Sequence, residues 1–396
     1  MKIVVCNIGS TSFKFQLLEM PAEQVLARGV AERVGAARSR VTCWAGGVEV
    51  RSAESSLPGQ GAAVRDALDF LARGPNPPLS SLEELDAVGF KCVQAGERNG
   101  SLIIDQEVVA AMDSCRDLAP AHNPAYLEAI AMFRDLLPQT PLVGVFEPGF
   151  HVDAPEYAKV YGTPYEWFEK YGVRRYGYHG ASHRFAASEV VQRLGLSPRR
   201  HRIVNCHLGG SSSLCAVRNG VSIDTSMGFS PQSGLIQGSR VGDLDPFSLP
   251  YVMRRKGITL EEALRECSEQ GGLAGISGTS GDMRDINDQI RAGSRRARLA
   301  RDKFIYDIKR YLGSYLLLME GLDAVSFSGG TGEHDAPLRA EVLESLGFLG
   351  LRLDESANRT GLGLITTPDS TIAALVVQAN EEIIVARETV RVLAAR

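Results

Sequence analysis

The sequence predicts an α/β protein built from two related domains, and three observations support this. The chain has 396 residues, which exceeds the usual size of a single domain. Short apolar runs alternate with segments of helical periodicity, as in α/β proteins. A strand, a turn of Gly and hydroxyl residues, and a second strand occur in this order twice, about half a chain apart, at residues 4–12 and 204–213.

Apolar runs predict the strands, because strands buried on both faces are short and almost continuously hydrophobic. In chain order the predicted strands are Lys2–Cys6, Phe13–Leu18, Ala87–Cys92, Leu142–Phe146, Ile203–Leu208, Ser213–Val217 and Ala324–Ser328. Apolar residues at helical spacing predict the helices. These are Ala62–Ala72, Asn123–Leu136, Ala181–Leu194, Thr259–Ser268, Arg295–Glu320 and Asn380–Ala394. The segment Arg73–Pro78 contains several Pro and other breakers, so we expect a loop there.

The repeated arrangement suggests a duplicated fold. In the second copy the strand continues to Asn219-Gly220, and Asn-Gly between apolar strands is a strong hairpin signal. Chance similarity between two ordinary hairpins is the alternative. A true duplication would give two domains facing each other across a cleft.

Composition and charge exclude several classes of protein. The 43 Lys and Arg against 47 Asp and Glu give a formal charge of −4, which does not favour binding to nucleic acid or an anionic membrane. No run approaches the roughly 20 apolar residues that span a bilayer. The N-terminal apolar run is too short for a signal peptide. The seven Cys form no CxxC pair or zinc-like spacing, so we expect reduced thiols and a cytoplasmic location.

Three turns rich in Gly and Ser follow apolar strands, at Asn7–Ser12, Gly209–Ser213 and Ser328–Glu333. Such turns place backbone N–H groups and hydroxyls together, which suits phosphate oxygens. None is a Walker loop, and each alone is more often an ordinary turn. Together they suggest a nucleotide held by both domains.

Charged residues and histidines lie in the same regions. Lys91 and Glu147 end or follow apolar strands, where α/β proteins place their chemistry, although a solvated surface charge is the simpler interpretation. His179 and His183 have the i,i+4 spacing of a zinc pair, but no third ligand is suggested nearby, so a structural role is the alternative.

Motif-like runs occur along nearly the whole chain. They are residues 7–14, 118–124, 174–183, 224–229 with 245–246, 275–278 with 282–286, 329–333 and 380–382; among them DTSMGF and DMRDI are the most specific. In these runs and their order the sequence resembles the acetate kinase family, within the larger group of sugar kinases, actin and Hsp70-type ATPases.

The resemblance implies two duplicated domains of the actin-like ATPase and sugar kinase type, with mixed sheets flanked by helices around a nucleotide cleft. It implies an N-terminal domain of residues 1–150 plus 382–396 and a C-terminal domain of residues 151–381 with the nucleotide site. It also implies a homodimer that transfers the γ-phosphate of ATP to a short carboxylate, giving an acyl phosphate and ADP, with Mg²⁺.

The resemblance also assigns roles to residues of this chain. The catalytic residues would be Lys91, Glu147, His179 and Arg240. The acid would contact Val93, Ala121, Tyr178 and Pro231. The nucleotide would contact Ser10, Ser12, Lys14, His207, Gly209, Gly210, Ser211, Asp282, Arg284, Gly330, Thr331 and His334. Asn7 and Glu381 would lie at the metal. A loose phosphoryl transition state needs in-line positioning and positive charge, which this set would supply.

Several positions depart from the family pattern. Lys91 replaces an Arg and Glu147 replaces an Asp, so the cation is less directional and the anion longer. We expect these two residues to act as a coupled pair. Gly210-Ser211 replaces Asn-Gly in a phosphate turn. Thr331 replaces Ile and His334 replaces Asn near the expected base, so base selectivity is expected to be relaxed. Ala121 replaces Leu and Tyr178 replaces Phe, which predicts a wider and more polar acid pocket.

Three functions are therefore in competition. The first is an ATP-dependent acyl kinase, favoured by Arg240, His179, Asn7 and Glu381. The second is a nucleotide-binding regulatory protein with little turnover. The third is a kinase with a hydroxyl acceptor, as in sugar kinases.

Overall fold

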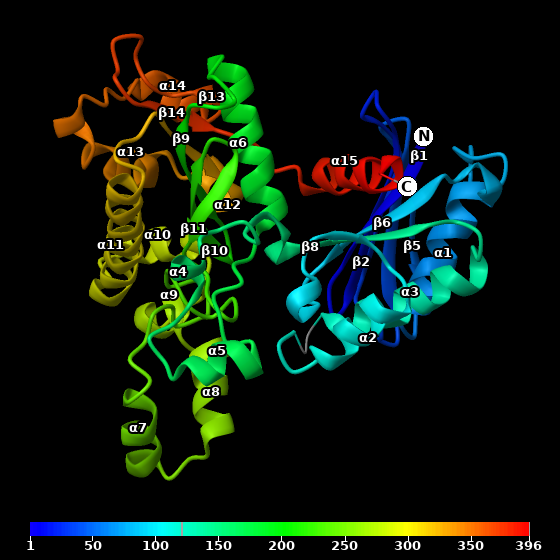
Figure 1. The fold of residues 1–396 in the computed structure, drawn as a ribbon, viewed down its shortest axis with the longest axis horizontal. Helices are drawn as coiled ribbons and strands as arrows, with labels where there is room; N and C mark the ends of the chain where they lie inside the picture. The colour runs from blue at the N-terminus through cyan, green and yellow to red at the C-terminus, as the bar shows by residue number, and fades with distance from the viewer. Residues whose placement is uncertain (120–121, 396) are drawn as a thin grey trace. The chain divides into compact units, whose positions relative to one another are not determined.

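The computed structural model describes residues 1–119 and 122–395. The chain forms two compact units, and each is described by itself (Figure 1). Unit 1 comprises Met1–Val152 and Asn380–Arg396, and unit 2 comprises Asp153–Ala379. Across the described ranges, no helix has both the length and the apolar character needed to cross a bilayer.

Unit 1 is built on an eight-stranded mixed sheet in the order β5-β4-β3-β2-β1-β6-β8-β7. The strands are β1 Lys2–Ile8, β2 Ser12–Glu19, β3 Gln24–Glu32, β4 Ser39–Ala45, β5 Val48–Ser55, β6 Ala87–Cys92, β7 Ser101–Ile103 and β8 Leu142–Phe146. Strands β1, β6 and β8 run parallel, and the other neighbours are antiparallel. The helices are α1 Gln60–Arg73, α2 Gln106–Ser114, α3 Asn123–Leu136 and α15 Glu381–Ala394. Short 3-10 helices occupy Leu82–Glu84, Gly96–Arg98 and Glu147–Phe150.

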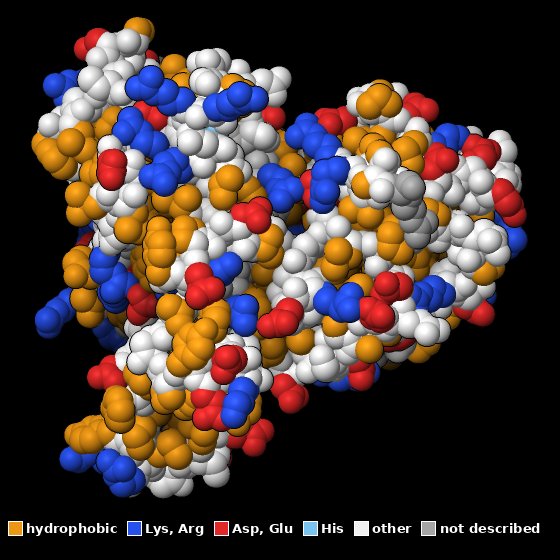
Figure 2. All heavy atoms as spheres, viewed as in Figure 1, with side chains coloured by type: hydrophobic (Ala, Val, Ile, Leu, Met, Phe, Trp, Pro, Cys, Tyr) orange, Lys and Arg blue, Asp and Glu red, His pale blue; other side chains and the backbone are white. Residues whose placement is uncertain are grey.

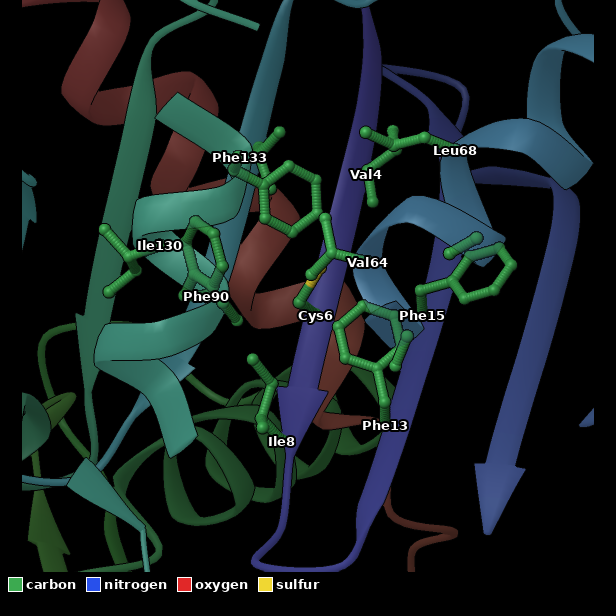
Figure 3. Close-up of a cluster of buried hydrophobic side chains, with 14 of the residues drawn as sticks. Val4, Cys6, Ile8, Phe13, Phe15, Val64, Leu68, Phe90, Ile130 and Phe133 are labelled. Atoms are coloured by element: carbon green, nitrogen blue, oxygen red, sulfur yellow. The ribbon is translucent and has the colours of Figure 1, made fainter. Parts of the chain in front are cut away.

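The core of unit 1 lies between the sheet and the helices α1 and α3 (Figure 3). Val64 of α1 and Phe133 of α3 meet side chains of β1, β2 and β6, and the rings of Phe90 and Phe133 pack edge to face at 5.4 Å. Successive strand residues point to opposite faces. The opposite face carries α15, which approaches β6 at Gly89, where a Cβ would come within 2.6 Å of Thr389 Oγ1.

Unit 2 is built on a six-stranded sheet in the order β11-β10-β9-β12-β14-β13. The strands are β9 Arg202–Leu208, β10 Ser212–Arg218, β11 Val221–Thr225, β12 Ala324–Ser328, β13 Gly363–Leu364 and β14 Ala373–Val376. The helices are α4 Glu156–Lys159, α5 Tyr165–Tyr171, α6 Gly180–Leu194, α7 Ser248–Lys256, α8 Leu260–Glu269, α9 Gly272–Ser277, α10 Met283–Arg291, α11 Arg295–Leu318, α12 Gly329–His334, α13 Ala336–Glu344 and α14 Glu355–Thr360, with a 3-10 helix at Gly347–Leu349. Residues of β9, β10, β12, β14, α11 and α13 form its core.

The predicted duplication is confirmed by topology. The run β3-β2-β1-β6-β8 and the run β11-β10-β9-β12-β14 have the same order and the same strand directions. In each run the central hairpin begins with β1 or β9, and this strand leads into one of the predicted Gly/Ser turns. Asn219 and Gly220, at φ +56° and +82°, form the hairpin turn between β10 and β11, as Asn-Gly predicts. The expected fold of two mixed sheets flanked by helices is therefore confirmed.

All of the predicted strands and helices are present, with ends shifted by a few residues at most. The missed strands were mostly those at the sheet edges, such as β5, whose residues are largely exposed and carry no apolar run. The missed helices are short, and α7 among them buries no residue completely.

Candidate functional site

The two hairpin turns are stabilised by their own Ser residues. In unit 2, the Ser212 hydroxyl accepts from the Gly209 N–H at 3.1 Å and donates to the Gly209 carbonyl at 3.0 Å. In unit 1, the Gly9 N–H donates to the Ser12 carbonyl at 2.9 Å, and the Gln60 amide donates to the Gly9 carbonyl at 3.0 Å. Gly210 has open space where a Cβ would be, so a ligand can approach its backbone closely.

The third Gly-rich segment differs from the sequence prediction, because Gly329 to His334 form the short helix α12 directly after β12 rather than a turn. Gly329 has φ +76°, and a Cβ there would lie 2.7 Å from the Leu208 carbonyl. Gly is therefore required for the chain to leave β12 beside the end of β9. The Glu333 carboxylate accepts from the Gly329 N–H at 3.0 Å and closes the first turn of the helix.

A cavity of about 530 Å³ lies between the Gly209–Gly210 turn, α10 and α12. It is lined by Gly209, Gly210, Leu273, Gly281, Asp282, Met283, Arg284, Asn287, Gly330, Thr331, His334, Asp335 and Pro337. Seven of the residues expected to contact nucleotide are in this set, so the structure brings together segments more than a hundred residues apart. Its size suits a small organic ligand.

Asp282 and Arg284 are held together at the rim of this cavity. Asp282 caps α10 by accepting from the Arg284 N–H at 2.9 Å. The Arg284 guanidinium pairs with the same carboxylate, and these bonds lower the pKa of Asp282 to about 2. Asn287 donates to Asp335 at 3.0 Å across the cavity wall. The sequence reasoning missed Asn287 and Asp335; the position of Asn287 one helical turn after Met283 on α10 was the available signal.

Arg240 places a largely buried positive charge beside the Gly209–Ser211 turn. Its Nη1 donates to Ser211 Oγ at 3.0 Å and to Gln237 Oε1 at 3.1 Å. Burial lowers the pKa of Arg240, and among residues 1–119 and 122–395 its side-chain bonds go to Ser211 and Gln237 and not to a carboxylate. A partly buried guanidinium with only neutral acceptors is well suited to binding an anion.

Three histidines, His179, His183 and His207, lie close together near the end of β9. His179 precedes α6 with φ +58°, and its Nδ1 lies 2.9 Å from Ser213 Oγ. His183 Nε2 lies 2.8 Å from the same hydroxyl, while the rings of His179 and His207 are 4.7 Å apart. The sequence offered His183 as part of a zinc-spaced pair and Ser213 as part of a phosphate turn, but it did not predict that the Ser213 hydroxyl joins the two histidines. In the described chain, no group of three or more His, Cys, Asp or Glu is arranged to hold a metal ion.

In unit 1, Lys91 lies between two carboxylates. Phe90 points into the core, so Lys91 points to the opposite face of β6, where α15 begins at Glu381. Glu147 follows β8, the neighbour of β6. Lys91 Nζ lies 2.9 Å from Glu147 Oε1 and also pairs with Glu381.

All three of these side chains are more than four-fifths buried. Burial alone would lower the pKa of Lys91, but Glu147 and Glu381 outweigh it and raise that pKa well above its usual value. The lysine is therefore charged at neutral pH. The sequence predicted a Lys91–Glu147 pair, while the contact with Glu381 was not foreseen.

The expected acid-binding residues are in different parts of the chain. Val93 follows β6 in unit 1 and is packed partly against its core. Tyr178 is 3% exposed, and its hydroxyl donates to the Phe229 carbonyl at 2.9 Å. The Pro231 carbonyl accepts from Gln237 at 2.7 Å. Ala121 lies outside the described residues.

The remaining expected residues are in unit 1. Ser10 and Lys14 are exposed on and after the first turn, and Ser12 begins β2. Asn7 on β1 and Glu381 on α15 offer an amide and a carboxylate oxygen, the ligands that Mg²⁺ prefers. The donor chemistry of this pair fits Mg²⁺, and the Glu381 carboxylate also pairs with Lys91.

Comparisons with known proteins cover nearly the whole chain. The model of the Acetokinase family matches residues 2–387. The acetate kinase of Carboxydothermus hydrogenoformans is 41% identical over 396 residues, covering 99% of both chains. That of Helicobacter hepaticus is 40% identical over 98% of both chains. Among solved structures, Porphyromonas gingivalis acetate kinase has a TM-score of 0.91 at 37% identity over 99% of both chains, and a Francisella tularensis propionate kinase has 0.89 at 32% identity over 98% of both chains.

Proposed function

The chain belongs to the acetokinase family, and we propose that it transfers the γ-phosphate of ATP to a short carboxylate, giving an acyl phosphate and ADP. The observation that carries this proposal is Arg240, a partly buried guanidinium without a carboxylate partner in the described chain, beside a Gly-rich turn that also lines a ligand-sized cavity. The relatives reported above include acetate kinases and a propionate kinase.

The nucleotide would occupy the cavity of unit 2. Its base would lie toward Asn287 and His334, and its phosphates toward Gly209, Gly210 and Gly330; the open backbone of Gly210 and Gly330 admits phosphate oxygens. Ser10, Ser12 and Lys14 of unit 1, with His207 and Ser211 of unit 2, would contribute further phosphate contacts. Thr331 and His334 are polar, which supports the expectation of relaxed base selectivity.

Arg240 and His179 would stabilise the transferring phosphoryl group by hydrogen bonds and charge, because its transition state spreads negative charge over three oxygens. Lys91 would act at the acid as a charged ammonium, and Glu147 would orient it. Asn7 and Glu381 would hold Mg²⁺, which when bound would neutralise charge on the phosphate oxygens.

The acid would be bordered by Val93, Ala121, Tyr178 and Pro231. Ala121 takes less space than the Leu expected there, so we propose an acid larger than acetate. The hydroxyl of Tyr178 is already bonded to the Phe229 carbonyl, so a hydroxyl on the acid would gain less from it than the sequence suggested. One extra buried methylene contributes about 0.8 kcal/mol, or about fourfold in kcat/KM.

A hydroxamate assay tests the proposed function. The protein is incubated with MgATP, hydroxylamine and acetate, propionate, butyrate or a hydroxylated acid. Hydroxamate formation supports acyl transfer. ADP release without hydroxamate would indicate a hydroxyl acceptor, and nucleotide binding with neither product would indicate a regulatory protein. If acetate has the highest kcat/KM of the panel, the larger acid pocket is refuted.

Arg240→Ala provides the residue-level test, because it removes the buried cation. Arg218→Ala is the matched control, since Arg218 is exposed at the end of β10 in the same unit. Hydroxamate formation should fall by at least a hundredfold in the first variant and remain unchanged in the second. Equal activities in the two variants would remove Arg240 from the mechanism.

We further propose a cytoplasmic homodimer. All seven cysteines are free thiols, and six of them are buried, which fits a reducing compartment. Figure 2 shows hydrophobic side chains over the α7–α8 pair of unit 2, where Phe247, Tyr251, Leu260 and Leu264 are each at least half exposed. Light scattering of the wild type and of Phe247→Glu would test whether this surface carries the dimer contact.

A further inference from the structure

Gln237 has a completely buried side chain whose amide is bonded at both ends. Its Oε1 accepts from Ser211 Oγ at 2.9 Å, Arg240 Nη1 at 3.1 Å and the Ser212 N–H at 3.4 Å. Its Nε2 donates to the Pro231 carbonyl at 2.7 Å. One side chain thus joins the Gly-rich turn, the buried cation and Pro231.

The backbone around Gln237 is fixed as firmly as its side chain. The Gln237 N–H donates to the Arg240 carbonyl at 3.0 Å, and the Leu273 N–H donates to the Gln237 carbonyl at 2.8 Å. The next residue, Gly238, donates to the Gly210 carbonyl at 3.0 Å. The Gln237 side-chain amide is therefore held in one orientation relative to its hydrogen-bond partners.

Gln237 contacts only one nitrogen of the Arg240 guanidinium. A guanidinium has five N–H donors, and the bonds to Gln237 and Ser211 use only Nη1. Within the part of the chain that the structure describes, Nε and Nη2 of Arg240 make no hydrogen bond, so they are available to a ligand. An amide oxygen holds the guanidinium without cancelling its charge, whereas a carboxylate at the same place would neutralise it.

We propose that Gln237 is a positioning residue for Arg240: it orients the guanidinium toward a phosphate oxygen and leaves the positive charge uncompensated. Its hydrogen bonds also link this orientation to the Ser211 turn and to Pro231. This role rests on the proposed function only for its catalytic meaning. The effect of Gln237 on phosphate binding is measurable without turnover.

The test compares two substitutions of similar size and opposite electrostatics. Gln237→Met removes both ends of the amide, and Gln237→Glu keeps the shape but adds a negative charge. Inorganic phosphate is the probe, and calorimetry gives its Kd. Loss of one hydrogen bond to a charged group should weaken binding by about ten- to a hundredfold in Gln237→Met. Gln237→Glu should weaken it further, because the new carboxylate pairs with Arg240 and repels the anion.

A structural role alone predicts the opposite order, since Glu fits the site of Gln better than Met does. A double-mutant cycle gives the second discriminating result: in an Arg240→Ala background, Gln237→Met should cause little further loss of phosphate binding. Ser211→Ala, which removes a neighbouring acceptor from the half-buried turn, should weaken binding less than Gln237→Met, and it serves if the Gln237 variants fail to fold. Circular dichroism and Tm identify such failures.

Phosphate binding by Gln237→Met equal to that of the wild type would overturn the inference, as would the absence of Arg240-dependent phosphate binding in the wild type. If the Gln237 variants do not fold, wild-type phosphate binding by Ser211→Ala would also count against the inference. If phosphate binding follows the expected order but no hydroxamate forms with any acid, Gln237 positions Arg240 and the proposed acyl transfer fails. In an active wild type, Gln237→Met should lower kcat more than it raises the KM for ATP.

Discussion

Replacing Lys91 by Met should destabilise unit 1 in a pH-dependent way, because it leaves two buried carboxylates without their cation. Met keeps most of the aliphatic length of Lys and removes only the charge. At 2.9 Å and an effective dielectric constant of about 20, the Lys91–Glu147 attraction is about 6 kcal/mol before desolvation. Removing one member of a buried pair typically costs about 3–5 kcal/mol. We expect about 3 kcal/mol, because Glu381 keeps 16% of its side chain exposed.

The sign of the pH dependence follows from the variant's carboxylates. Without Lys91, burial raises the folded-state pKa of Glu147 above its unfolded value of about 4.3. The protonated form is then favoured in the folded state, so the penalty is small at low pH and grows as the pH rises through the unfolded pKa. The difference between variant and parent should therefore be near 3 kcal/mol at pH 7.5 and at least 1 kcal/mol smaller at pH 5.

The chain supplies its own probe for this measurement. It has two tryptophans, Trp44 on β4 in unit 1 and Trp167 on α5 in unit 2. Trp167 is 47% exposed, so a Trp167→Phe background should be mild and leaves Trp44 as the fluorescence reporter of unit 1. Urea unfolding followed at Trp44 then gives the free energy of unfolding of that unit.

Two controls separate burial from charge. Arg38→Met removes a cation 3.0 Å from Glu54 in the same unit, but both of those side chains are more than 60% exposed, so about 0–1 kcal/mol is expected. Adding Glu147→Gln to Lys91→Met should recover part of the loss, since it removes one uncompensated charge. A loss below about 1 kcal/mol at pH 7.5, or one that is equal at both pH values, would refute the reasoning.

The other predictions concern unit 2. Gly329→Ala should lower Tm by several degrees, since its Cβ would lie 2.7 Å from the Leu208 carbonyl, whereas Gly330→Ala should leave Tm unchanged and weaken ADP binding in calorimetry; equal Tm losses would contradict this. Asn287→Ala should weaken ADP binding by about tenfold through loss of one polar contact, and an unchanged Kd would place the nucleotide elsewhere. Because the pKa of Asp282 is about 2, its pairing with Arg284 is present above the unfolded pKa of about 3.9 and lost only as the pH falls toward 2; a carbon-13 NMR titration showing a midpoint above 4 would be inconsistent with that pairing.

The sequence determined the elements whose signal is local. Each buried central strand is an apolar run, the Asn219-Gly220 turn has its own residue chemistry, and the two Gly/Ser turns repeat in the same order. These patterns also carried the resemblance, and the family match over residues 2–387 confirms it. They were readable because hydrophobic periodicity and turn conformations depend on residues close together in the chain.

Only the tertiary structure decided which distant groups meet. Lys91, Glu147 and Glu381 come from β6, the segment after β8 and the start of α15, and no local pattern predicts that one ammonium pairs with both carboxylates. Gln237 has an ordinary place in a polar loop, and its importance is visible only once Ser211 and Arg240 lie against it. The physical reason is that burial and pairing of polar groups are set by sheet order and helix packing, which bring together residues far apart in sequence.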